Sequence, residues 1–279
     1  MIHTVTGKFI TCSFINPGSP TAMCLIAFAL GQNSHFPLVL AANRDEFYQR
    51  PTAPMAWWTT EANTEVLSGR DQRSGGTWLA VTRDGRISAV TNVREGSPEA
   101  GRVSRGELPL RALQEPEARL QQSLVDNPDR YAGFNLVSLS GPGGWYFSNR
   151  DAHPGRQVHK GTYGLSNHLL QTPWPKLVRL RDALGQAVAT TSGSQDELHR
   201  TLTTLLQDPT PAPDHLLPDT GVPRETERFL SSVFIAGDQY GTRATTVVSI
   251  THDHRIQVTE QAWEPGGVQG EFRRFHWQR

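Results

Sequence analysis

The stretch CLIAFALGQNSHFPLVLAANRDE, residues 24–46, indicates the fold of this chain. It contains two continuous apolar runs, residues 24–30 and residues 38–42, joined by a short polar segment. Short apolar runs bounded by turn residues are typical of buried β-strands. Because strands joined by so short a connection must be antiparallel, the stretch predicts a buried hairpin.

Three further pairs of runs follow the same pattern along the chain. Asp84 and Gly85 separate the runs 77–82 and 87–92, and glycine tolerates the positive φ of a tight hairpin turn. The other two pairs are residues 133–140 with 145–149 and residues 245–250 with 256–263. The chain is therefore predicted to be rich in antiparallel sheet.

Helical patterns lie between these hairpins. Thr172 and Pro173 are predicted to start a helix in which leucine or valine recurs at positions 177, 180, 184 and 188. Ser194 and Glu197 form a capping box before a second helix, and a weaker helical block covers residues 104–126. Hairpins separated by pairs of helices predict an α+β fold in which two antiparallel sheets pack face to face and helices cover the outside.

The composition is that of an ordinary globular protein. The 279 residues include 27 basic and 27 acidic side chains, so neither nucleic acid nor a charged membrane surface is indicated as a partner. No apolar run reaches about 18 residues, so no transmembrane segment is expected. The two cysteines, Cys12 and Cys24, make a poor disulfide framework and favour a reducing, cytoplasmic setting. His252 and His254 lie in a polar turn without clustered ligands, so no metal site is expected.

Residues 1–22 differ from the rest of the chain. They show no clear period, end in the turn-rich segment NPGSP (residues 16–20) and do not have the pattern of a secretory signal. We interpret residues 1–22 as a mispredicted start, with Met23 as the true initiator and residues 23–279 as a single domain. A propeptide that is cleaved before Cys24 is the alternative.

Cys24 gains a second reactive group if Met23 is the initiator. Removal of Met23 leaves Cys24 with a free α-amine, whose reference pKa of about 7.7–8.0 lies close to the thiol value of about 8.5. One residue then carries both a nucleophile and a base, which is the pairing that covalent catalysis requires. The alternative is that Cys24 is a small buried core residue, as free cysteines usually are.

Four polar residues follow the second apolar run directly. In a strand, Asn43 and Asp45 lie on one face and Arg44 and Glu46 on the other. Charges at the end of a strand beside the strand that begins with Cys24 predict a site at the rim of the sheet. The alternative is an ordinary solvated loop.

An ordered set of motifs extends beyond this region. The chain contains, in order, MCLIAF (23–28), NRDE (43–46), GGTWL (75–79), TNVR (91–94), SRG (104–106), GFNL (133–136), YGLSN (163–167), PWPK (173–176) and YGTR (240–243). This set resembles the NRDE family, also called the transport and Golgi organisation 2 family, over nearly all of residues 23–279. Residues 1–22 lie outside the resemblance.

The resemblance carries expectations for fold and site. The family is similar, more distantly, to the cysteine N-terminal-nucleophile hydrolases that cleave bile-salt amides and penicillin V, whose fold is a four-layer αββα sandwich. By this likeness Cys24 is the nucleophile and, through its amine, the base. Asp45 orients the amine, while Asn92 and Asn167 form the oxyanion hole.

The chain departs from the bile-salt enzymes at Ala42, where they have an arginine. Arg44 adjoins Asp45, and regular strand geometry is expected to direct it away from the thiol. Arg243 could supply the missing charge, bind a substrate carboxylate or phosphate, or form a surface salt bridge. His168 follows Asn167 and is a further candidate for the site. Asn43 and Arg44 complete the expected binding residues.

Two functions follow from the resemblance. The first is a cysteine amidohydrolase that cleaves a carbon–nitrogen bond of a small substrate through a thioester acyl-enzyme and requires no cofactor. The second is a non-catalytic protein that binds or traffics haem or lipid on the same scaffold, since the family is associated with haem mobilisation and lipid metabolism and a fold does not determine a function. Haem is the ligand expected in that case.

Overall fold

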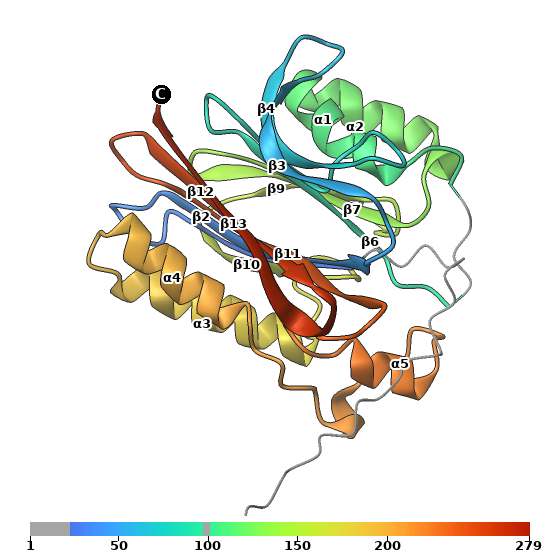
Figure 1. Cartoon of the computed structure of the whole chain (residues 1–279). Helices are drawn as coiled ribbons and strands as arrows, with labels where there is room; N and C mark the ends of the chain where they lie inside the picture. Colours follow the sequence, from blue (N-terminus) through green and yellow to red (C-terminus); the bar gives the residue numbers. More distant parts are fainter. Residues whose placement is uncertain (1–22, 97–100) are drawn as a thin grey trace, which may run out of the picture.

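Two antiparallel sheets form the centre of the computed structural model, which describes residues 23–96 and 101–279 (Figure 1). The six-stranded sheet has the order β10 (Gly161–Leu165), β1 (Met23–Leu30), β2 (Leu38–Phe47), β11 (Tyr240–Ile250), β12 (Arg255–Glu264) and β13 (Val268–Gln278). The seven-stranded sheet runs in chain order through β3 (Thr52–Thr59), β4 (Glu65–Asp71), β5 (Leu79–Thr82), β6 (Ile87–Asn92), β7 (Phe134–Ser140), β8 (Gly143–Ser148) and β9 (Gly155–Val158).

Helices cover the outer face of each sheet (Figure 1). The six-stranded sheet is covered by α3 (Pro175–Thr190) and α4 (Gln195–Leu205), and the seven-stranded sheet by α1 (Leu108–Gln114) and α2 (Glu117–Asp126). A short helix, α5 (Arg224–Phe229), precedes β11. The predicted four-layer αββα sandwich of two antiparallel sheets is therefore confirmed.

The first hairpin is apolar throughout because both of its faces are buried. Ile26, Phe28 and Leu30 of β1 point between the two sheets, whereas Leu25 and Ala27 point toward α3 and α4. A strand buried on both faces carries a continuous apolar run instead of an alternating one. The four predicted hairpins are all present. Their strand bounds lie within a few residues of the prediction except that β2 ends five residues later and β11 begins five residues earlier.

Some helix boundaries differ from those that the sequence patterns predicted. The first predicted helix starts at Pro175 with Trp174 as its N-cap, and not at Thr172 and Pro173. Ser194 caps α4 as predicted, accepting a hydrogen bond from the Glu197 amide at 3.3 Å. The block 104–126 is two helices, since Pro116 lies between α1 and α2.

Several strands were not predicted. The hairpin of β3 and β4, the strands β9 and β10, and the C-terminal strand β13 have weaker or alternating patterns. In β13 partly buried and exposed residues alternate, because it is an edge strand. The interpretation of residues 1–22 falls outside the described part of the chain.

Candidate functional site

The register between β1 and β2 organises the site. Cys24 lies directly opposite Arg44, and Met23 lies directly opposite Asp45. Directly opposed residues of an antiparallel pair point to the same face of the sheet. Cys24, Arg44 and Glu46 therefore face the second sheet, and Met23 and Asp45 face the helix layer. The expectation that Arg44 points away from the thiol is wrong, because it considered the faces of β2 without the register of β1.

A cavity of about 720 Å³ lies in front of Cys24. Cys24 and Arg44 contribute to its wall from the six-stranded sheet, and Thr91 and Asn92 contribute from β6 of the other sheet. Two loop segments, residues 71–78 and 101–106, complete most of the remaining wall. This volume is within the range of about 300–1,000 Å³ that small-molecule sites occupy.

Close backbone packing holds the two loops together. The Thr77 amide donates to the Gly106 carbonyl at 2.8 Å. A Cβ atom on Gly76 would lie 2.4 Å from the backbone of Gly106, so only glycine permits this approach. The motifs GGTW and SRG are thus explained in part by the contact that shapes the cavity.

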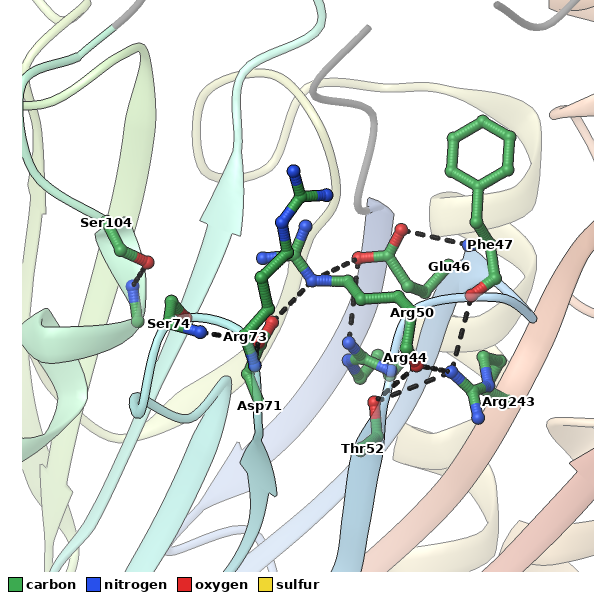
Figure 2. Close-up of polar contacts among 11 residues, drawn as sticks. Arg44, Glu46, Phe47, Arg50, Thr52, Asp71, Arg73, Ser74, Ser104 and Arg243 are labelled. Carbon is green, nitrogen blue, oxygen red and sulfur yellow. Dashed lines mark hydrogen bonds and ion pairs between the residues drawn. The ribbon is translucent and has the colours of Figure 1, made fainter. Parts of the chain in front are cut away.

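Arg44 is fixed by an aromatic side chain and a carboxylate. Its guanidinium lies 4.3 Å from the ring centroid of Trp78, a cation–π distance. It also lies 3.5 Å from the carboxylate of Glu46 (Figure 2). The ring of Trp78 in turn packs on Gly69, where a Cβ atom would lie 2.2 Å from it. One terminal nitrogen of Arg44, Nη1, is buried and has no hydrogen-bond partner in the described residues.

The thiol of Cys24 is buried at the cavity wall and only 6% of the residue is exposed. Burial raises the pKa of this thiol to about 12, although the charge of Arg44 acts to lower it. The thiol is therefore protonated at neutral pH, and any reaction at its sulfur requires a base that removes the proton.

Asn92 and Asn167 meet although they come from different sheets. Asn167 follows β10, is fully buried, and its Nδ2 donates to Asn92 Oδ1 at 2.8 Å. Only Asn92 of the two lines the cavity, and its Nδ2 has no hydrogen-bond partner among the described residues. Asn167 thus orients Asn92, and the amide that faces the cavity beside Cys24 belongs to Asn92.

Asp45 lies on the helix side of the sheet in a buried cluster of charges. Its Oδ1 accepts a hydrogen bond from Thr242 at 2.7 Å, and its Oδ2 has no partner among the described residues. Burial raises the pKa of the Asp45 carboxyl to about 6, opposed by the charge of Lys176 and the Thr242 hydrogen bond. The buried ion pair of Arg94 with Glu227 lies nearby, and Arg94 Nη2 also donates to Met23 Sδ at 3.2 Å.

Lys176 belongs to this cluster and was not predicted as a site residue. Its Nζ donates to the Leu230 carbonyl at 2.8 Å, and burial lowers its pKa to about 8. A signal was present in the sequence, because Lys176 ends the motif PWPK. It also adjoins Leu177 and precedes Leu180 by four positions, so it lies at the buried face of α3.

Three of the expected binding residues do not line the cavity. Asn43 faces the helix layer, where its amide bonds the carbonyls of residues 206 and 233 and the hydroxyl of residue 245. Arg243 bonds the carbonyls of Phe47 and Arg50 and holds the turn between β2 and β3 (Figure 2). His168 is exposed and bonds Thr172.

The fold and the site together define a class of protein. It is a four-layer αββα sandwich with a cavity at one rim of its sheets and a buried cysteine in the cavity wall.

Sequence comparison identifies the family. The family model for Transport and Golgi organisation 2 matches residues 23–265, and the chain belongs to this family. Its relatives include the bovine Transport and Golgi organization protein 2 homolog, with 34% identity over 86% of this chain and 93% of that protein. The human and mouse homologs show 32% and 31% identity over the same shares.

Comparison with solved structures finds a mutant of the conjugated bile acid hydrolase from Clostridium perfringens. The TM-score is 0.43 with 10% sequence identity, over 90% of this chain and 92% of that chain. Within residues 23–96 and 101–279, no helix has both the length and the apolar character that crossing a membrane requires.

Proposed function

We propose that this protein is a cysteine amidohydrolase whose mature chain begins at Cys24. One observation carries the proposal: the strand position opposite the amino side of Cys24 holds a buried carboxylate, Asp45, with an unpartnered oxygen. A buried carboxylate oxygen without a partner is costly, and a nearby ammonium would offset the cost.

The α-amine of Cys24 fits that position. Met23 lies opposite Asp45, and the nitrogen of Cys24 belongs to the peptide bond that joins Cys24 to Met23. This nitrogen is therefore close to the strand position that faces Asp45. Without Met23, the space of its buried side chain, beside Tyr240 and Leu230, opens next to Asp45. The α-ammonium would then take the place of a peptide bond, with Lys176 and Arg94 as the neighbouring cations.

The reaction uses two groups of the same residue, the thiol and the α-amine of Cys24. The Cys24 sulfur attacks the substrate carbonyl carbon while its proton passes to the α-amine. The carbon–nitrogen bond then breaks, the ammonium returns the proton to the leaving amine, and a thioester remains. Water attacks the thioester, its proton passes to the α-amine, and the released thiolate recovers that proton as the acid leaves.

Asn92 is the group that would stabilise the oxyanion. Asn92 and Cys24 line the same cavity, and Asn167 fixes the orientation of the Asn92 side chain by donating to its Oδ1. A single donor aimed at developing negative charge is worth about 3–4 kcal/mol in the transition state. Asn167 is accordingly a positioning residue in this proposal.

The intact mass of protein from its native host is the first test. A chain that begins at Cys24 is expected. A chain that keeps a peptide bond on the amino side of Cys24 removes the base and overturns the proposal.

Covalent labelling separates the hydrolase from a carrier. With a reactive lactam, one acyl adduct per chain is expected at Cys24 and none on a Cys24→Ser variant. Among the residues that line the cavity, Cys24 is the one ordinary ligand of haem iron. A haem absorption band that persists in Cys24→Ser, together with no adduct on the native chain, would support the carrier instead.

A further inference from the structure

The cavity in front of Cys24 has an excess of positive charge. Five arginines and two carboxylates line it, which are Arg44, Arg50, Arg73, Arg102, Arg105, Glu46 and Asp71. The whole chain has no net charge, with 27 basic and 27 acidic residues. The excess is therefore a local feature of this cavity.

Both carboxylates of the cavity are already engaged. Asp71 pairs with Arg50 at 2.5 Å, and Glu46 lies 3.6 Å from Arg50 and 3.5 Å from Arg44 (Figure 2). Arg50 thus lies between two carboxylates. The uncompensated charge resides on the other arginines of the wall.

Arg44 and Arg105 hold this charge next to the thiol. Arg44 lies opposite Cys24 in the sheet, and its buried Nη1 has no partner within the described residues. Arg105 donates from Nη1 to the Gly133 carbonyl at 3.0 Å, and no carboxylate of the described chain pairs with it. The charges of both arginines act to lower the pKa of the Cys24 thiol, which agrees with their position beside it.

Arg73 adds a cation at the exposed side of the same cavity. Its backbone is held by the Asp71 carboxylate, which accepts from the amides of residues 73 and 74 at 2.9 and 3.0 Å. Its guanidinium makes no hydrogen bond or ion pair with the side chains drawn in Figure 2. The loop is thus ordered while the charge at its tip stays available to a ligand.

From these observations we propose that the cavity binds its substrate through an oxyanion group, a carboxylate or a phosphate, held by Arg44 and Arg105 beside Cys24 with Arg73 at the entrance. Planar guanidinium groups match the oxygens of both groups with paired hydrogen bonds. A buried guanidinium nitrogen without a partner favours a ligand that accepts from it. The inference deepens the proposed function, because it makes the substrate an anionic amide, but the anion site exists whether or not the protein is an amidohydrolase.

Alkylation of Cys24 by two reagents of similar size tests the proposal on the full chain. Iodoacetate carries a carboxylate and iodoacetamide is neutral, and both form a thioether with loss of iodide. The rate of each is measured at Cys24 by peptide mass spectrometry, so that Cys12 does not contribute. The iodoacetate-to-iodoacetamide rate ratio is expected to exceed that of glutathione by about tenfold or more.

Arginine variants separate a binding site from a change in thiol reactivity. Any effect on the thiol pKa alters both rates equally and cancels in the ratio. Arg44→Met and Arg105→Met should each lower the ratio several-fold, and Arg73→Met, at an exposed position, gives a variant that does not disturb the core. Arg243→Met, outside the cavity, is the matched control and should leave the ratio unchanged. A native ratio equal to that of glutathione, or a ratio unchanged in all three cavity variants, overturns the proposal.

Protection identifies the kind of oxyanion. Inorganic phosphate, acetate and chloride are compared at equal ionic strength for slowing of iodoacetamide at Cys24. Protection by phosphate indicates a phosphorylated substrate, and protection by acetate indicates a carboxylate. Equal rates in all three salts would mean that no oxyanion site exists. Because iodoacetamide requires no catalysis, these outcomes do not depend on amidase activity.

Discussion

The two halves of β2 are buried alike and differ in chemistry. The first half, residues 38–42, is entirely apolar and at most 6% exposed. The second half, Asn43, Arg44, Asp45 and Glu46, is at most 4% exposed although every residue is polar. The same strand therefore forms the core of the sandwich over one part of its length and a charged site over the next.

The difference lies in how the buried groups are partnered. Apolar side chains gain free energy from burial, whereas buried charges cost free energy unless they are paired. Only Asn43 has its polar groups satisfied, while Arg44 Nη1 and Asp45 Oδ2 have no hydrogen-bond partner in the described chain. Glu46 Oε2 makes ion pairs with Arg44 and Arg50 but accepts no hydrogen bond from the described residues. Unpartnered buried polar atoms are rare in folded proteins. We infer that this half of β2 is built for function at the expense of stability.

The largest effect on stability is expected in the apolar half. Leu40→Ala leaves a cavity between the sheets, where Leu40 is fully buried, and should lower the free energy of unfolding by about 2–5 kcal/mol. Chemical denaturation measures the loss. The rate ratio of the two alkylating reagents at Cys24 should stay as in the native chain. A changed ratio would mean that the two halves of β2 are not independent.

Asp45→Asn is expected to act in the opposite direction on stability. The folded pKa of Asp45 is raised from 3.8 to about 6, so the folded chain holds this proton more tightly than the unfolded chain. Stability from this group is fully present below about pH 4 and is lost as the pH rises through 6. Above pH 6, in a chain that retains Met23, the substitution should stabilise by on the order of 3 kcal/mol. Denaturation at pH 4 and pH 7 measures the change.

In a chain that begins at Cys24, Asp45→Asn is expected to have the opposite effect on stability at pH 7. An α-ammonium beside Asp45 would lower its pKa, and the loss of stability between pH 4 and 6 should disappear. Asp45→Asn should then destabilise at pH 7, because it leaves the ammonium unpaired. Identical pH profiles for the two forms of the chain would show that the amine does not reach Asp45.

Sequence patterns predicted both halves of β2 but not their relation to β1. The apolar run and the alternation of faces at residues 43–46 are local properties and were predicted correctly. The position of Arg44 opposite Cys24 depends on the register of the hairpin, which the connection of residues 31–37 sets and no residue pattern reveals. The contact of Asn92 with Asn167 depends on how the two sheets pack against each other, so the hydrogen bond between them could not be predicted from the sequence.

Lys176→Met is expected to shift the pH dependence of Cys24 labelling moderately, through its effect on the α-amine. In a chain that begins at Cys24, the positive charge of Lys176 would favour the neutral amine, since like charges nearby disfavour protonation. The variant should raise the pH at which lactam labelling of Cys24 reaches half its maximum rate, by about one unit. Lys160→Met, at an exposed position, is the control. If Lys176→Met is still labelled and the pH of half-maximal labelling does not shift, the charge of Lys176 does not act on the α-amine.

Arg243→Met is expected to have the smallest effect and tests whether position matters more than charge. Arg243 lies on the strand beside β2 but does not line the cavity, and its Nη1 holds the Arg50 carbonyl at 2.5 Å and the Phe47 carbonyl at 3.3 Å. Loss of these bonds should lower the free energy of unfolding by about 1 kcal/mol, as measured by denaturation. Lactam labelling and the alkylation ratio at Cys24 should not change. If the ratio fell as it does for Arg44→Met, the whole rim would act as one diffuse positive field, and the distinction between a cavity arginine and a structural arginine would fail.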